Sequence, residues 1–144
     1  GYAGLAFFLD SDTSEQLFIG KLSGNGQYSG TRGLGTFGTP LDADTHMIVA
    51  RFSFQDSNDQ IDVFLDPDLT LPEHMQTIDG STSLDLQFDR LRFSSGSGAG
   101  SWLWDEIRFG ENWASVAQVP EPSAALLGLL ACLGLLLPRR RRCR

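Results

Sequence analysis

The chain has 144 residues, 18 of them acidic and 11 basic, and this length suits one domain with an appended segment. Residues 1–122 contain all 18 acidic residues but only six basic ones, so this part has a net charge of −12. Binding to nucleic acid depends on clustered Lys and Arg, so the charge argues against a nucleic-acid partner.

The first ten residues have the composition of a strand rather than that of a signal peptide, and the chain starts with Gly1. We therefore expect the natural N-terminus to lie upstream and the domain to be incomplete at this end. Both cysteines, Cys132 and Cys143, lie near the C-terminus. The rest of the chain therefore offers no thiol for a disulfide, a nucleophile or a Cys-based zinc site.

Apolar and polar residues alternate along residues 1–117, and Gly, Ser, Asn and Asp break the apolar runs. A period of two is typical of half-buried strands, whereas a helix repeats every 3.6 residues. The pattern predicts strands at residues 5–9, 16–22, 47–54, 61–65, 84–88, 91–94 and 102–109, with a short last strand near 114–117. Seven or eight short strands favour an all-β fold, an antiparallel, jelly-roll-like β-sandwich.

The same alternation predicts which side chains face the core. The inward-facing set comprises Ile48, Ala50, Phe52, Phe54, Leu84, Leu86 and Phe88. The alternation slips by one residue between Phe88 and Leu91, which predicts a bulge or a strand break at Asp89 and Arg90. The glycine-rich residues 23–38 and 94–101 are expected to form long loops.

Calcium is the one ion for which the loops offer candidate ligands. Two turns gather oxygen ligands, but neither has the spacing of an EF-hand loop, so solvated turns are the favoured interpretation. The two clusters comprise Asp10, Asp12 and Glu15, and Asp56, Asn58 and Asp59. His46 and His74 have no second histidine at ligand spacing and are expected in solvated loops. We expect no other cofactor.

Tryptophans gather at and after the predicted strand 102–109. Trp102 and Trp104 would lie on one face of that strand, and Trp113 follows closely. Indole rings stack on sugar rings and also fill cores, so core packing is the favoured interpretation and ligand binding the alternative.

Asp105 lies in phase with the apolar residues of the same strand and would point towards the core. A buried carboxylate needs a partner, and we expect Arg51 or Arg92 to provide it in a structural ion pair. A role of Asp105 in a ligand or calcium site is the alternative. Asp105 and Glu106 would point to opposite faces of the strand, so they cannot form the carboxylate pair of a glycosidase. No catalytic residue is predicted.

In residues 17–21, 48–52 and 104–110, the domain is similar to the concanavalin-A-like (LamG-like) jelly rolls of exported bacterial proteins. The most distinctive block is Trp-Asp-Glu-Ile-Arg-Phe-Gly at 104–110. Some glucanases share this sandwich, but their Glu-x-Asp-x-x-Glu arrangement is absent from the chain. A glucanase-like hydrolase is therefore the least favoured function.

Three physically different blocks make up the C-terminal segment. Prolines in residues 118–123 fix the backbone and predict an extended linker. Residues 124–137 are uncharged and apolar on all sides, and they predict a short transmembrane helix over 124–138. At about 1.5 Å per residue this helix is shorter than a hydrocarbon core of about 30 Å. A buried core helix and an unprocessed tail anchor are therefore alternatives.

Five arginines end the chain, at Arg139, Arg140, Arg141, Arg142 and Arg144. Directly after an apolar helix they can reach the lipid headgroups and hold residues 139–144 on the cytoplasmic side of the membrane. The domain would then face outwards. A eukaryotic glycolipid-anchor signal is the nearest competitor, but it lacks such a basic end.

The order of these blocks resembles the PEP-CTERM sorting signal of Gram-negative bacteria. The motif residues are Val119, Pro120, Glu121, Pro122 and Ser123. The resemblance implies recognition by an exosortase, a membrane-embedded cysteine protease, with cleavage near the motif. It predicts an exported protein, anchored in the inner membrane before processing and then carried at the cell surface or in the extracellular matrix, where it could bind polysaccharide weakly.

Overall fold

The computed structural model of the chain describes residues 1–10, 14–42, 44–96, 98 and 100–117. These residues belong to two units, Gly1–Ile107 and Arg108–Arg144. The motif Val119 to Ser123, the apolar block 124–138, the terminal arginines and both cysteines lie outside the described residues. None of the helices in the described part has the length and apolar character that a bilayer crossing requires.

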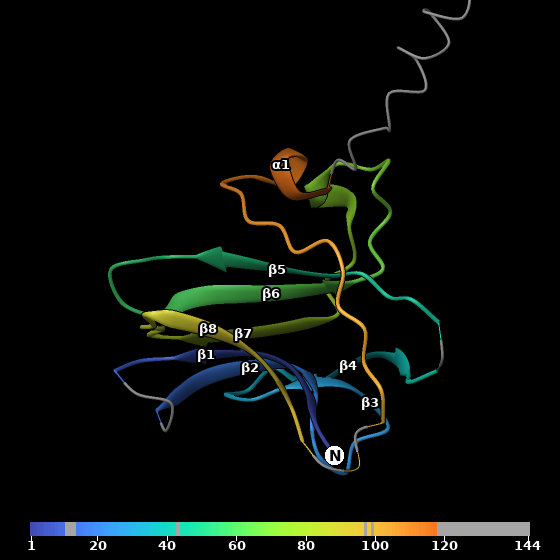
Figure 1. The fold of residues 1–144 in the computed structure, drawn as a ribbon. Helices are drawn as coiled ribbons and strands as arrows, with labels where there is room; N and C mark the ends of the chain where they lie inside the picture. Colours follow the sequence, from blue (N-terminus) through green and yellow to red (C-terminus); the bar gives the residue numbers. More distant parts are fainter. Residues whose placement is uncertain (11–13, 43, 97, 99, 118–144) are drawn as a thin grey trace, which may run out of the picture. The chain divides into compact units, whose positions relative to one another are not determined.

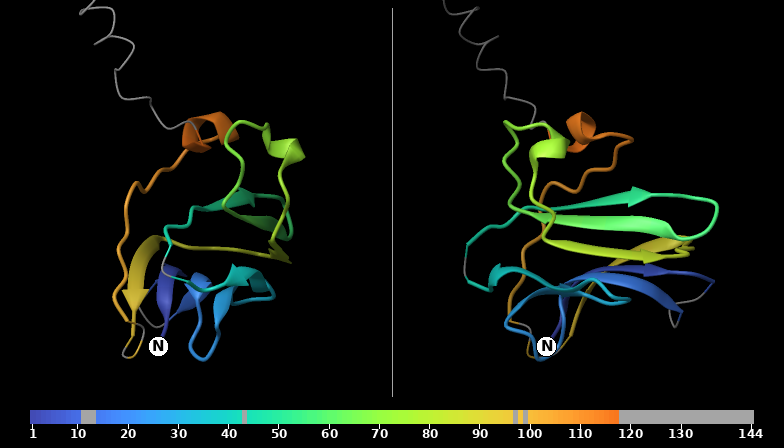
Figure 2. Two further views of the ribbon diagram at one scale, coloured as in Figure 1. Left: turned by 90° about the vertical axis from the view of Figure 1, so that its right-hand side faces the viewer. Right: turned by 180° about the vertical axis from the view of Figure 1, so that it is seen from behind.

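Two antiparallel sheets stack as layers in the unit Gly1–Ile107 (Figures 1 and 2). The first has the order β4-β3-β2-β1-β8, and the second has the order β5-β6-β7. The strands of the first sheet are β1 (Ala3–Phe8), β2 (Glu15–Lys21), β3 (Gln27–Gly30), β4 (Gly35–Pro40) and β8 (Arg90–Ser95). Those of the second are β5 (Ile48–Ser53), β6 (Asp59–Leu65) and β7 (Gly80–Leu84), with a 3-10 turn, η1 (Glu73–Met75), before β7. The expected all-β sandwich is therefore confirmed at the level of fold class.

The core lies between the two sheets. Its buried side chains come from both layers: Phe7, Leu17, Ile19, Tyr28, Leu34, Phe37, Ile61, Val63 and Leu86. Ile48, Ala50 and Phe52 pack against this cluster, as do Leu84 and Phe88, so the predicted facing of these residues is confirmed. Phe54 is the exception, because it lies beyond the end of β5 and is 64% exposed.

The glycine-rich residues 23–38 were expected to form a long loop, but they include β3 and most of β4. Tyr28 and Phe37 pair across this hairpin and both side chains reach the core. Two large aromatic residues therefore outweigh the low strand propensity of the surrounding glycines. The predicted strand at 84–88 is also displaced, because β7 ends at Leu84. The predicted break at Asp89 and Arg90 holds for Asp89, which lies outside a strand, but not for Arg90, which begins β8.

The prediction of a strand at residues 102–109 is wrong. These residues have no regular secondary structure, and Glu106 has a φ of 49°, which interrupts an extended strand. Leu103 is 94% exposed and Phe109 72% exposed. Alternation gives a segment the capacity to form a strand, but a ladder also needs a neighbouring strand, and no described strand pairs with this segment.

The second unit contains α1 (Trp113–Ala117), where a short strand was expected. Asn112 precedes this helix, and its side-chain oxygen accepts a hydrogen bond of 3.0 Å from the backbone N–H of Ser115. The sequence Asn-Trp-Ala-Ser therefore starts a helical turn through a local cap. This cap is the reason why the predicted last strand is wrong.

Candidate functional site

The outer face of the five-stranded sheet carries small residues on β1, the strand between β2 and β8. Gly4 and Ala6 of β1 point away from the core, whereas Phe7 points into it. Gly4 lies opposite Gly20 on β2 and opposite Ser94 on β8. Gly4 and its two neighbours are all small, so the sheet has a depression at this level.

Aromatic rings fill part of this depression. Phe18 lies opposite Ala6, and a Cβ atom added to Gly4 would lie 2.6 Å from the Phe18 ring. A Cβ atom added to Gly96 would lie 2.3 Å from the ring of Tyr2. Tyr2 and Phe18 meet edge to face with their centroids 6.2 Å apart. The glycines therefore make room for two rings on the outer face of the sheet, where Phe18 is 3% exposed and Tyr2 is 39% exposed.

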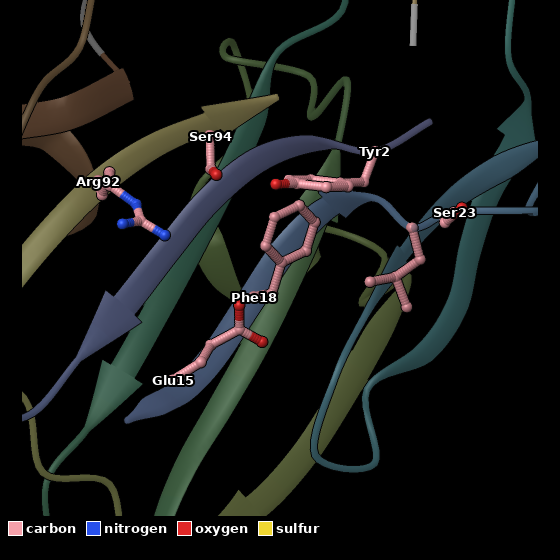
Figure 3. A pocket seen from close by; sticks show the side chains of 7 residues that line it. Tyr2, Glu15, Phe18, Ser23, Arg92 and Ser94 are labelled. Atoms are coloured by element: carbon pink, nitrogen blue, oxygen red, sulfur yellow. The ribbon is translucent and has the colours of Figure 1, made fainter. Parts of the chain in front are cut away.

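A shallow pocket of about 220 Å³ opens beside these rings (Figure 3). It is lined by Tyr2, Glu15, Phe18, Leu22, Ser23, Arg92 and Ser94. Pockets that enclose drug-sized ligands measure about 300 to 1,000 Å³, so this one suits a single small ring. The lining combines an apolar base with two charged groups and three hydroxyls, a composition that fixes the orientation of a polar ligand.

The two charged side chains project over the sheet from strands on either side of β1, as Figure 3 shows. The guanidinium carbon of Arg92 lies 4.4 Å from the centroid of the Phe8 ring, which orients this side chain by a cation–π contact. Desolvation raises the pKa of the Glu15 carboxyl, and the positive charges of Arg92 and Arg32 oppose that shift. Glu15 and Arg92 thus lie within electrostatic range of each other.

The ligand-binding residues predicted from the sequence lie elsewhere. Trp102 is half-buried against the main core, and Trp104 packs on Phe93 with a centroid distance of 4.9 Å. Trp113 belongs to the second unit. The pocket lining includes none of these three rings.

The expectation that Asp105 is buried is wrong, because this residue is exposed. The segment around Asp105 is not a strand, so its phase with the apolar residues does not direct it inwards. Its carboxylate accepts a hydrogen bond of 2.8 Å from the backbone N–H of Glu106. Arg51, one of its two expected partners, forms ion pairs with Asp62 and Glu73 instead.

The acidic turns proposed for calcium have structural contacts where they are described. Both carboxylate oxygens of Asp59 accept backbone hydrogen bonds, from Gln55 at 2.8 Å and from Leu86 at 2.9 Å. Asp12 lies outside the described residues. Within the described part of the chain, no three His, Cys, Asp or Glu side chains are grouped as a metal site requires.

A second pocket, of about 260 Å³, lies in the loop around η1 and is lined by several aspartates. Their oxygens already accept hydrogen bonds from the protein. Asp79 accepts one from the backbone of Leu65, and Asp68 accepts two from Thr70. These contacts shape the loop, so we regard the pocket on the five-stranded sheet as the better candidate.

We expected His46 to lie in a solvated loop, but only 11% of its side chain is exposed. Its two ring nitrogens lie 2.8 Å from Asp42 and 2.5 Å from Asp66. Asp66 also accepts a hydrogen bond of 2.8 Å from the backbone N–H of Met47. Hydrogen bonds to Asp66 and Asp42 raise the pKa of His46 to about 9. The cluster ties the segment before β5 to the end of β6. His74, by contrast, is exposed as predicted.

The raised pKa of His46 predicts a pH-dependent stability. A group whose pKa is raised in the folded state stabilises that state fully below its ordinary value of 6.5, and the contribution is lost as pH rises through about 9. Because both aspartates are half-exposed, we expect a loss of roughly 1 to 2 kcal/mol. Thermal unfolding measured from pH 6.5 to above pH 9 should show this loss in the natural chain and in His74→Gln, but not in His46→Gln. Equal pH dependence in all three proteins would contradict this role of His46.

Comparison with known proteins adds no assignment: no family model, no curated protein and no solved structure matches this chain.

Sequence reasoning did not identify the pocket, although one signal for it was present. Residues 4–7 alternate small residues (Gly4, Ala6) with large ones (Leu5, Phe7), which indicates that the outer face of this strand is hollowed rather than polar. The contribution of β8 could not be read in the same way. Arg92 and Ser94 lie 74 to 79 residues after Glu15 and Phe18 in the sequence, and the pairing of β1 with β8 brings them to the same surface.

Proposed function

We propose that this chain is an exported surface or exopolysaccharide-associated protein whose β-sandwich binds glycan weakly and whose C-terminal segment is a sorting signal. The observation that carries the binding role is the pocket on the outer face of the five-stranded sheet. Its aromatic rings, hydroxyls, carboxylate and guanidinium are the groups that a sugar ring can contact through its C–H face and its hydroxyls.

The sorting role is supported by the order of three independent features in the last 26 residues. An extended Pro-Glu-Pro linker can enter a protease site, the apolar block holds the chain in lipid, and the arginines hold its end at the inner headgroups. An exosortase is the proposed processing enzyme. Cleavage would release the domain to the cell surface or the extracellular matrix.

We propose no enzymatic activity for the domain. Glycoside hydrolysis uses two carboxyl groups that face one cleft, about 5 to 9.5 Å apart. The lining of the pocket includes one carboxylate, that of Glu15, and its other charged group is the guanidinium of Arg92. This pair suits binding and gives no general acid and base for a glycosidic bond.

The sorting role can be tested by intact-mass measurement. We expect the protein to lose the residues after about Pro120 in a Gram-negative host with an exosortase, and to keep its full mass in the same host without the enzyme. Glu121→Gln should stay at full mass in the inner-membrane fraction, because the motif has lost its charge. Glu111→Gln, a matched change ten residues upstream, should be processed normally.

Identical full-length mass in both hosts would contradict the sorting role and favour a tail-anchored periplasmic binding module. The binding role has its own test, because retention of the protein on neutral polysaccharide does not depend on processing. If the protein is processed but is retained on no polysaccharide, the result would support the sorting role and contradict the binding role.

A further inference from the structure

The charge of the domain restricts the ligands that its surface can attract. Residues 1–122 carry a net charge of −12, so an anionic ligand approaches against a repulsive field. The exopolysaccharides of bacteria contain both neutral sugars and uronates, and these two classes differ in charge. The chain's own charge therefore favours the neutral class.

The charges inside the pocket are balanced. Arg92 provides a planar set of N–H donors from β8, and Glu15 provides carboxylate acceptors from β2 (Figure 3). Neighbouring hydroxyls of a sugar both donate and accept, so one can accept from the guanidinium while the next donates to the carboxylate. A uronate carboxylate could pair with Arg92, but it would lie close to the negative charge of Glu15.

The size and the apolar part of the pocket fit one ring. A volume of about 220 Å³ is smaller than the about 300 to 1,000 Å³ of pockets that enclose drug-sized ligands. The Tyr2, Phe18 and Leu22 side chains form its apolar part, and hydroxyls of Ser23 and Ser94 lie at its sides. A pyranose has the same combination of an apolar C–H face and a polar edge.

We propose that this pocket binds one uncharged pyranose unit, with adjacent hydroxyls held between Arg92 and Glu15 and the C–H face against Tyr2, which is 39% exposed. This inference rests on the glycan-binding role proposed above and specifies its ligand class. The selection against uronates comes from Glu15, the acidic residue of the lining.

The test is calorimetric titration of the full chain in a detergent whose headgroup carries no sugar. The probes are methyl glycosides of glucose, galactose and mannose, together with the methyl glycosides of the matching uronic acids. In the latter, a free carboxylate replaces the C6 hydroxymethyl group. We expect at least one neutral glycoside to bind with a Kd in the millimolar range, and its uronate to bind at least about tenfold more weakly. A uronate that binds as tightly as its neutral partner would overturn the inference.

Two variants locate the binding and one controls for charge. Arg92→Gln should weaken the neutral sugar about tenfold or more, as expected for the loss of a hydrogen bond to a charged group. Glu15→Gln should weaken binding of the neutral sugar similarly and reduce the difference in Kd between the neutral sugar and its uronate. Arg90→Gln, on the same strand but outside the lining, should bind as the natural chain does. Thermal unfolding identifies any variant whose fold has changed.

Failure of the binding role and failure of the ligand assignment look different in this experiment. Absence of binding by all six sugars would overturn the glycan-binding function and this inference with it. Binding of a neutral glycoside that both Arg92→Gln and Glu15→Gln leave unchanged would keep the function and move the site elsewhere, which would overturn the inference alone.

Discussion

Substitution of Gly20 by alanine is expected to prevent the β-sandwich from folding stably. Gly20 lies on β2 with a φ of 151°, a backbone conformation that residues with a side chain rarely adopt. An added Cβ atom would lie 2.4 Å from the carbonyl oxygen of Ala3 and 2.5 Å from the Cα atom of Gly4. Both are backbone atoms of the neighbouring strand β1, so no rotation of a side chain can relieve the overlap.

The expected cost of this substitution is at least about 3 to 5 kcal/mol, a large part of the about 5 to 15 kcal/mol that stabilises a typical domain. Circular dichroism of the full chain should show a large fall in melting temperature, or loss of the β signal. Gly26→Ala is the matched control, because its Cβ atom would meet nothing within 4 Å. If Gly20→Ala melted within a few degrees of the control, the close approach of β1 and β2 would be disproved.

Replacement of Asp59 by alanine is expected to have the second largest effect. Asp59 is 4% exposed, and its two carboxylate oxygens accept hydrogen bonds from the backbone of Gln55 and of Leu86. Leu86 belongs to the main core, so its N–H would be buried without this partner. Loss of two hydrogen bonds to a charged acceptor predicts a destabilisation of about 2 to 4 kcal/mol.

Asp59→Asn separates the hydrogen bonds from the general effect of substitution at this position. One amide oxygen can replace one carboxylate oxygen, so this variant should lose about half as much stability as Asp59→Ala. Asp56→Ala, in the same turn but exposed, should change the free energy of unfolding by less than about 0.5 kcal/mol. Equal stability of Asp59→Ala and Asp56→Ala would contradict the bridging role of Asp59.

The fold class could be predicted because apolar and polar residues alternate along several of the strands. In β5, Ala50 and Phe52 pack against the core, and Arg51 between them is exposed. The hairpin of β3 and β4 could not be predicted in the same way. Its stability comes from Tyr28 and Phe37, whose burial depends on residues of the other sheet.

The site was harder to predict than the fold, because a pocket depends on pairings between distant segments. Arg92 was considered only as a partner for Asp105, and that idea depended on a strand at 102–109 that does not form. The contact of His46 with Asp66 was also missed, because it depends on the pairing of β5 with β6. Asp66 lies 20 residues after His46 and is brought to it by the return of the chain along β6.

The most direct test of the central claim is a map of where sugar contacts the domain. Methyl glycosides of the three neutral sugars would be titrated into the isotope-labelled full chain, with NMR shifts followed residue by residue. Binding at the proposed pocket predicts the largest changes at Tyr2, Phe18, Arg92 and Ser94. Changes confined to Trp102 and Trp104, or no change at saturating sugar, would contradict it.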